Sequence, residues 1–177
     1  MNIVYIILII IVLLFFIFLF FDVTLYKLKN YVSRINLVED KINYLLDSKY
    51  ENIIKINDII KDKIGTEKEI IDDISSLKNE NKSKSEIDTI LIESLSKIEY
   101  IKDQYDELDN EEELNGLFNS IKKDDETLNA YKKYYNDNVN DYNIIIKKFP
   151  YALTAKLFKH KEKEFFDDTK IIKEITN

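Results

Sequence analysis

The apolar side chains at the start of the chain are not interrupted by any polar position. Residues 3–21 consist of Ile, Val, Leu and Phe with one Tyr, and none of them is charged. As a helix, these 19 residues would span about 28 Å, close to the hydrocarbon thickness of a bilayer. The run lacks the basic start, short apolar core and small residues of a cleaved signal peptide. We therefore predict a retained transmembrane anchor from Ile3 to Phe21.

The pattern changes after the anchor, where apolar residues recur at alternating steps of three and four. This spacing predicts one long amphipathic helix over residues 25–64, ended by Gly65. Eight of its ten inward positions are apolar, and together they form a seam that should face other helices. The seam consists of Leu28, Val32, Ile35, Glu39, Ile42, Leu46, Lys49, Ile53, Ile56 and Ile60.

Two shorter helices are expected next. Thr66 and Glu69 match a capping box, so a second helix should begin there and use Ile70, Ile71, Ile74 and Leu77 as its apolar face. The polar stretch 79–85 predicts a loop. A third helix is expected over residues 86–108, with one stripe that Ser94 interrupts: Ile87, Leu91, Ile98, Ile101, Tyr105 and Leu108.

The fourth predicted helix is long, covering residues 111–148. Asn110 is expected to cap its start, and Pro150 ends it because proline disfavours helical geometry in the preceding residue. Nine of its eleven seam positions are apolar or aromatic: Leu114, Leu117, Ile121, Asp124, Leu128, Tyr131, Tyr135, Asn138, Tyr142, Ile145 and Phe149. A short basic amphipathic segment, Tyr151 to Lys163, follows.

These elements predict an all-α protein: an N-terminal transmembrane helix followed by an antiparallel four-helix bundle with long first and last helices. The expected segments are an anchor at 1–21, the bundle at 22–163 and a C-terminal tail at 164–177. An even number of antiparallel helices returns the chain to the side where it started. The basic segment 151–163 should therefore lie beside the membrane end of the first helix.

Composition narrows the chemistry. The chain has no cysteine, two glycines and one proline, which argues against disulfide scaffolds, cysteine-ligated zinc and glycine-rich phosphate loops. A net charge of −7 with a single arginine argues against nucleic acid as a partner. No cofactor is expected.

Candidate catalytic and metal-binding residues are scarce. His160 is the only histidine, and Leu157 stands three residues before it, where a di-iron bundle would carry glutamate. The acidic stretch 103–113 has Tyr105 or Leu108 where a calcium loop needs an oxygen ligand. We therefore predict no catalytic residue and no metal ligand, and a protein that is not an enzyme.

Residues 135–150 read YNDNVNDYNIIIKKFP, with two Tyr-Asn pairs seven residues apart and then Phe-Pro. This stretch resembles the C-terminal signature of the LemA family, and the similarity continues through Ala155, Phe158 and residues 164–166. Tyr26 to Val32 and the spacing of Ile42, Leu46, Tyr50 and Ile53 are similar to the family's first helix. The resemblance implies an anchored antiparallel helical bundle and no established molecular activity.

The chain departs from the family pattern at several positions. Glu39 and Ile54 stand where the family usually has an aromatic residue and a proline, and Ser48-Lys49 replaces a basic pair. The stretch Phe158 to His160 lacks the usual glycine. The chain therefore looks like a divergent member.

Two surfaces are candidate binding sites. The first is a docking patch of motif residues, Tyr135, Asn136, Tyr142, Asn143, Phe149 and Pro150, although tyrosines at helical spacing also suit core packing and the asparagines also suit hydrogen bonds between helices. The second is a lipid contact by Lys156, Lys159, Lys161 and Lys163, whose alternative is a cap that closes the bundle.

We therefore predict a membrane-anchored, non-enzymatic protein-interaction module at the bacterial cell membrane. Its N-terminal helix would lie in the lipid bilayer, and its bundle would bind an unidentified protein. The alternative is a self-associating coiled-coil scaffold, in which the seams of the first and fourth helices pair between chains. Lys27, Lys29 and Arg34 follow the anchor and no basic residue precedes it, which predicts a cytoplasmic bundle.

Overall fold

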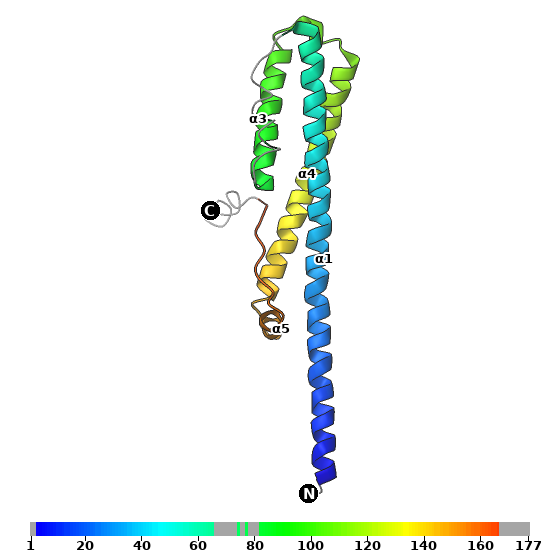
Figure 1. Ribbon diagram of the computed structural model, residues 1–177, viewed down its shortest axis with the longest axis vertical. Coiled ribbons are helices and arrows are strands. Elements are labelled where there is room, and N and C mark those ends of the chain that lie inside the picture. Colours follow the sequence, from blue (N-terminus) through cyan, green and yellow to red (C-terminus); the bar gives the residue numbers. More distant parts are fainter. Residues whose placement is uncertain (1–2, 66–73, 75–76, 78–81, 167–177) are drawn as a thin grey trace. The chain divides into compact units, whose positions relative to one another are not determined.

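The computed structural model describes residues 3–65, 74, 77 and 82–166, and these residues are largely helical with no strand among them (Figure 1). This confirms the all-α fold class. In chain order the elements are α1 (Ile3–Ile64), α3 (Lys84–Lys102), the 3-10 helix η2 (Asp106–Leu108), α4 (Glu112–Ile145) and α5 (Tyr151–Leu157).

The chain divides into two compact units. Unit 1 combines Met1–Leu37 with Tyr135–Phe165, and unit 2 combines Val38–Tyr134 with Phe166–Asn177. Helices α1 and α4 each contribute residues to both units. Unit 1 therefore unites two segments that are nearly 100 residues apart in the sequence.

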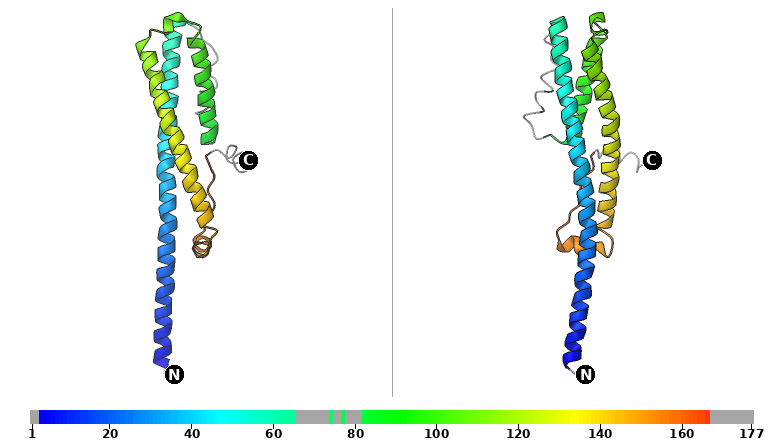
Figure 2. Two further views of the ribbon diagram at one scale, coloured as in Figure 1. Left: turned by 180° about the vertical axis from the view of Figure 1, so that it is seen from behind. Right: turned by 90° about the vertical axis from the view of Figure 1, so that its right-hand side faces the viewer.

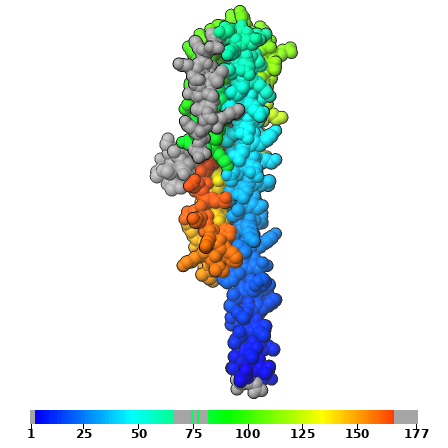
Figure 3. All heavy atoms as spheres, in the orientation of Figure 1, coloured from blue at the N-terminus to red at the C-terminus, as the bar shows by residue number. Residues whose placement is uncertain are grey.

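The first part of α1 is apolar and uncovered. Its most apolar 18-residue window has a mean hydropathy of 3.6, and none of that window is buried (Figure 3). The residues from Ile3 to Leu19 are all exposed, whereas Thr24 and Leu28 are buried. The helix is thus long and apolar enough to cross a membrane, and packing against the rest of unit 1 begins just after the apolar run.

In unit 2, α4 runs antiparallel to α1. Two ion pairs fix this direction: Lys49 Nζ lies 2.8 Å from Asp125, and Lys63 Nζ lies 2.8 Å from Glu111. As α1 advances from residue 49 to residue 63, α4 therefore retreats from residue 125 to residue 111.

Helix α3 of unit 2 runs parallel to α1. Lys84 pairs with Glu39, and Asp88 lies 4.0 Å from Lys49. The predicted second helix, with its capping box at Thr66 and Glu69, lies largely outside the described residues. Of its four apolar residues, the structure describes Ile74, which is fully buried, and Leu77, which is half-buried.

The predicted seams form the cores of both units. All ten α1 positions are buried or half-buried, and so are ten of the eleven α4 positions. In unit 1, α5 follows the end of α4 and lies beside α1 (Figure 2). The three helices share one core, with Tyr31, Val32, Tyr135, Ile145, Tyr151 and Phe165 packed around it. That core consists of Leu28, Ile35, Val139, Tyr142, Ile146 and Ala155.

Some predicted positions and boundaries were wrong. Phe149 was assigned to the α4 seam but is 81% exposed, because α4 ends at Ile145 and its periodicity ends there too. Tyr105 is exposed because α3 ends at Lys102, before the predicted residue 108. Helix α4 begins at Glu112, so Glu111 rather than Asn110 precedes its first turn.

The start of α3 has a clear local cause. The Ser83 side chain accepts a hydrogen bond from the Glu86 backbone, and the Glu86 carboxylate accepts one from the Ser83 backbone. This capping box starts the helix at Lys84, two residues before the predicted start at Glu86. The hydrogen bonds from Ser83 hold the pKa of the Glu86 carboxyl below its usual value.

Candidate functional site

The last described residues of unit 1 run back along α4 without secondary structure of their own. The Asn143 side chain holds this C-terminal segment, residues 158–165, by two hydrogen bonds. Its amide nitrogen donates to the Lys163 carbonyl at 2.8 Å, and its oxygen accepts from the Lys163 backbone at 2.9 Å. About two turns earlier on α4, the Tyr135 hydroxyl donates to the Glu164 carbonyl. Tyr135 and Asn143 of the Tyr-Asn motif thus bind the C-terminal segment of the same chain.

A second contact joins the same segment to α4 through Tyr142 and His160. The Tyr142 hydroxyl and His160 Nδ1 are 2.9 Å apart and share a hydrogen bond. Burial raises the pKa of the Tyr142 hydroxyl. Burial and the nearby positive charge of Lys29 lower the pKa of the His160 imidazole. The surroundings of His160 therefore favour its neutral form.

Helix α5 is attached to α1 just beyond the apolar run. The hydroxyls of Thr24 and Thr154 form a buried hydrogen bond of 2.6 Å, and Lys27 Nζ lies 5.1 Å from the centre of the Tyr151 ring. Helix α5, the first part of the predicted basic segment, therefore lies beside α1 just after the apolar run. Lipid contact itself stays a prediction.

The end of α5 forms a Schellman motif. His160 N donates to the Ala155 carbonyl at 2.9 Å, and Lys159 N donates to the Lys156 carbonyl at 3.4 Å. The motif places Lys159 in the left-handed region, with φ 57°. Glycine is favoured at this position because it has no Cβ. The missing glycine of the stretch 158–160 therefore coincides with a left-handed residue.

A comparison with protein-family models matches residues 39–175 to the LemA family. The chain belongs to the LemA family. The match covers most of the chain, including the Tyr-Asn and Phe-Pro signature, and begins after the apolar run. None of the curated proteins searched matches the chain.

With membership established, the signature can be assigned to positions in this LemA protein. Its residues do not form one exposed patch. Tyr142 and Asn143 are buried, Tyr135, Asn136 and Pro150 are half-buried, and Phe149 is exposed. The alternative of core packing and internal hydrogen bonding describes Tyr142 and Asn143, and docking by this set stays a prediction.

The four candidate lipid-contacting lysines also differ in their surroundings. Lys156, Lys159 and Lys161 are exposed. Lys163 is half-buried, and its Nζ donates to the Asn36 side chain at 3.4 Å. Lys163 therefore forms a contact within unit 1.

Sequence reasoning missed an ionic cluster in unit 2. Lys49 is only 1% exposed, and its Nζ lies 2.8 and 3.1 Å from the two carboxylate oxygens of Asp125. Asp88 is buried beside it and pairs with Lys132. The signal was available, because Lys49 interrupts an apolar seam and a buried lysine needs an acidic partner.

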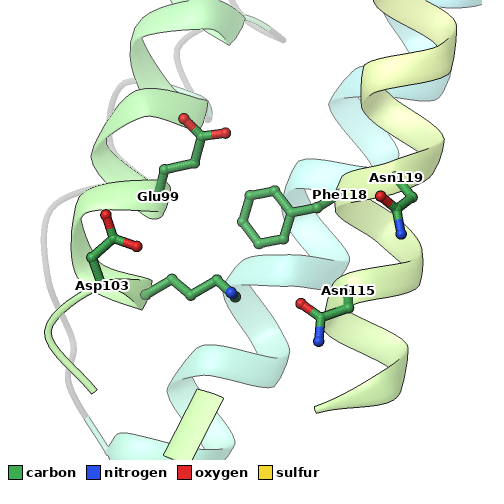
Figure 4. A pocket seen from close by; sticks show the side chains of 6 residues that line it. Glu99, Asp103, Asn115, Phe118 and Asn119 are labelled. Carbon is green, nitrogen blue, oxygen red and sulfur yellow. The ribbon is translucent and has the colours of Figure 1, made fainter. Parts of the chain in front are cut away.

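A hollow in unit 2 lies between the end of α3 and the start of α4. Figure 4 shows Phe118 of α4 pointing toward α3, with carboxylates opposite it. The hollow has a volume of about 420 Å³ and is open to solvent, and its lining is largely polar: Glu99, Lys102, Asp103, Asn115, Phe118 and Asn119. Within the described part of the chain, no three His, Cys, Asp or Glu side chains are grouped to hold a metal ion.

Proposed function

We propose that this LemA protein is a single-pass protein of the bacterial cell membrane whose helical part is a non-enzymatic protein-interaction module. The observation that carries the proposal is the wholly uncovered apolar window of α1, with its mean hydropathy of 3.6. A core helix of a soluble protein would bury such a surface, since each Å² of exposed apolar area costs about 25 cal/mol.

Continuity of the first helix favours a retained anchor over a cleaved signal peptide. Helix α1 continues without a break from Ile3 to Ile64. Thr24, three residues after Phe21, already takes part in a buried hydrogen bond with Thr154. Cleavage at the end of the apolar run would fall inside this continuous helix.

A non-enzymatic role is supported by how the polar side chains of unit 1 are used. His160, Tyr142 and Asn143 are the residues most suited to chemistry near the signature. All three are engaged in hydrogen bonds that fix the C-terminal segment. Their arrangement suits structural support of a binding surface.

The exposed face of α1 is the surface we propose for a protein partner. Tyr26 and Leu37 are 73% and 63% exposed and lie eleven residues apart, which puts them on the same side of the helix. Pairing between chains through the predicted seams is less favoured, because those seams are buried within a single chain. Lys27, Lys29 and Arg34, which follow the apolar run, support a cytoplasmic position for the bundle.

Anchoring is tested by the double variant Val12→Arg/Phe16→Arg. Arginine at the centre of a transmembrane helix costs about 2.5–3.5 kcal/mol per residue, so the protein should move from the membrane to the alkaline-washed soluble fraction. The matched control is Asn30→Arg/Asn140→Arg, which adds the same charge at exposed helical positions and should stay in the membrane. Retention of both variants would contradict anchoring by this segment.

The interaction role is tested by a photo-crosslinking residue at Leu37 in intact cells, with the same residue at Asn140 as control. One discrete adduct with a different protein, seen only from Leu37, is expected. An adduct of twice the chain mass would instead support the self-associating scaffold. No adduct from Leu37 would refute binding through this face.

A further inference from the structure

Helix α5 is apolar on the side that faces away from α1. Its inner face buries Thr154 and Ala155. The outer side exposes apolar side chains on the helix and on both flanks, which we call the α5 apolar face: Phe149 (81% exposed), Leu153 (52%), Leu157 (61%) and Phe158 (47%).

The attachment point fixes where this face lies along α1. Thr154 is bonded to Thr24, and Thr24 is three residues beyond Phe21, which is about 4.5 Å along a helix axis. The headgroup layer on each side of a bilayer is about 5–8 Å deep. If residues 3–21 fill the hydrocarbon core, α5 lies at the depth of the headgroups.

The charges around α5 fit the same position. Three lysines beside the apolar face are exposed: Lys148, Lys156 and Lys159. The acidic residue of α1 closest in sequence to Thr24 is Asp22. Glu162 is paired with Lys147 at 2.8 Å. Exposed lysines next to exposed apolar side chains are typical of segments that lie on anionic membranes.

Lys163 lies too far along the helix to share this role. Its Nζ contacts Asn36, twelve residues beyond Thr24, which corresponds to about 18 Å along α1. This exceeds the depth of the headgroup layer. The structure therefore divides the predicted lysine set, with Lys156 and Lys159 on the lipid side and Lys163 away from it.

We propose that the α5 apolar face inserts into the boundary between headgroups and acyl chains of the bilayer that α1 crosses, with Lys148, Lys156 and Lys159 contacting anionic headgroups. This inference rests on the proposed anchoring of residues 3–21. The C-terminal part of unit 1 is then a second membrane contact, held in place by the Thr24–Thr154 hydrogen bond.

The test uses the full chain in vesicles of equal parts phosphatidylcholine and phosphatidylglycerol. Because the chain has no cysteine, single cysteines can be labelled with an environment-sensitive fluorophore. Leu157→Cys reports on the α5 apolar face, Ile11→Cys on the anchor, and Asp137→Cys on an exposed position of α4. Lipid-attached quenchers are placed either near the headgroup or near the acyl chain end.

Leu157→Cys should show blue-shifted emission and strong quenching by the shallow quencher but little by the deep one. Ile11→Cys should be quenched by the deep quencher, and Asp137→Cys by neither. Quenching at Ile11 without quenching at Leu157 would overturn the inference and leave the anchoring intact. No quenching at Ile11 would overturn both.

The charge contribution is tested by reversing one charge. Adding Lys156→Glu to the Leu157→Cys chain should reduce shallow quenching in the anionic vesicles by more than half and have little effect in pure phosphatidylcholine. Arg34→Glu is the matched reversal, ten residues beyond Thr24, and should leave the quenching unchanged. Equal effects of the two reversals would refute headgroup contact by Lys156.

Discussion

At the scale of single residues, the polar interruptions of the seams are matched across helices. Lys49 of α1 meets Asp125 of α4, Glu39 of α1 pairs with Lys84 of α3, and the Ser48 hydroxyl donates to Asp124 at 3.2 Å. The seam breaks Lys49 of α1 and Asp124 of α4 thus lie at the same level of unit 2, and Glu39 is matched by Lys84 of α3. Such pairs stabilise one register of the helices, because a shift would leave a buried charge without a partner.

Replacing Lys49 by Met tests this pairing. Removing one partner of a buried ion pair costs roughly 3–5 kcal/mol, but Asp125 is 31% exposed and can be rehydrated, so we expect a loss of about 2–3 kcal/mol. Urea unfolding of the full chain in detergent micelles, followed by circular dichroism, measures it. Lys55→Met, at an exposed position of α1, should change the free energy of unfolding by less than about 0.5 kcal/mol. Adding Asp125→Asn to Lys49→Met should restore part of the loss.

Replacing Lys159 by Gly should stabilise the protein. A side chain in the left-handed region, such as that of Lys159, costs about 1–2 kcal/mol. Glycine removes this cost, but the greater entropy of its unfolded chain offsets roughly half of the gain. The expected gain is about 0.5–1 kcal/mol in the free energy of unfolding. Lys156→Gly, inside α5, should instead lose about 0.5–1 kcal/mol. A loss for both variants would show that Lys159 is not strained.

His160 should make stability depend on pH. Its folded pKa lies below the ordinary value of 6.5, so the unfolded chain binds more protons in this range. The stabilising contribution of neutral His160 is then fully present above about pH 6.5. The free energy of unfolding falls as the pH is lowered below this value, until the folded imidazole also protonates. Melting temperatures at about pH 7.5 and 5.5 should differ more in the parent than in His160→Gln, which leaves no imidazole in the chain. Equal differences would contradict the lowered pKa.

At the scale of elements, regular helices were predictable and the C-terminal segment was not. The α1 seam followed from spacing alone, since ten positions on one face of an unbroken helix must share one environment. The segment 158–165 has no period to read. It is held by hydrogen bonds from side chains to backbone groups, and the sequence does not indicate which backbone group an asparagine such as Asn143 will bind. The basic character of α5 was visible in the sequence, but its attachment to Thr24 across 130 residues was not.

Replacing Asn143 by Ala should free the C-terminal segment. Each of the two lost hydrogen bonds contributes about 1 kcal/mol, so the exchange of the Lys163 amide should accelerate about 10- to 30-fold. Hydrogen exchange of the peptide that covers residues 159–166 measures this change. Asn140→Ala, at an exposed position one turn earlier on α4, should leave the exchange rate as it is. Similar rates in both variants would show that other contacts hold the segment.

At the scale of the whole molecule, the predicted orientation puts everything after the apolar run in the cytoplasm. Lys27, Lys29 and Arg34 all follow Phe21 within thirteen residues, and cytoplasmic flanks carry such an excess of basic residues. A cysteine introduced at the exposed position Lys55 should not react with a membrane-impermeant maleimide in intact cells. It should react fully after lysis, and labelling before lysis would reverse the topology.

The assembly of unit 1 from two distant segments of the sequence has a consequence for biosynthesis. Thr24 is made early, whereas its partner Thr154 follows 130 residues later. At about 5–20 residues per second this delay lasts roughly 7–26 s. Throughout that interval Leu28 and Ile35 lack the α4 and α5 side chains that cover them in the finished protein. The nascent chain therefore exposes an apolar surface on α1 until residues 139–155 are made.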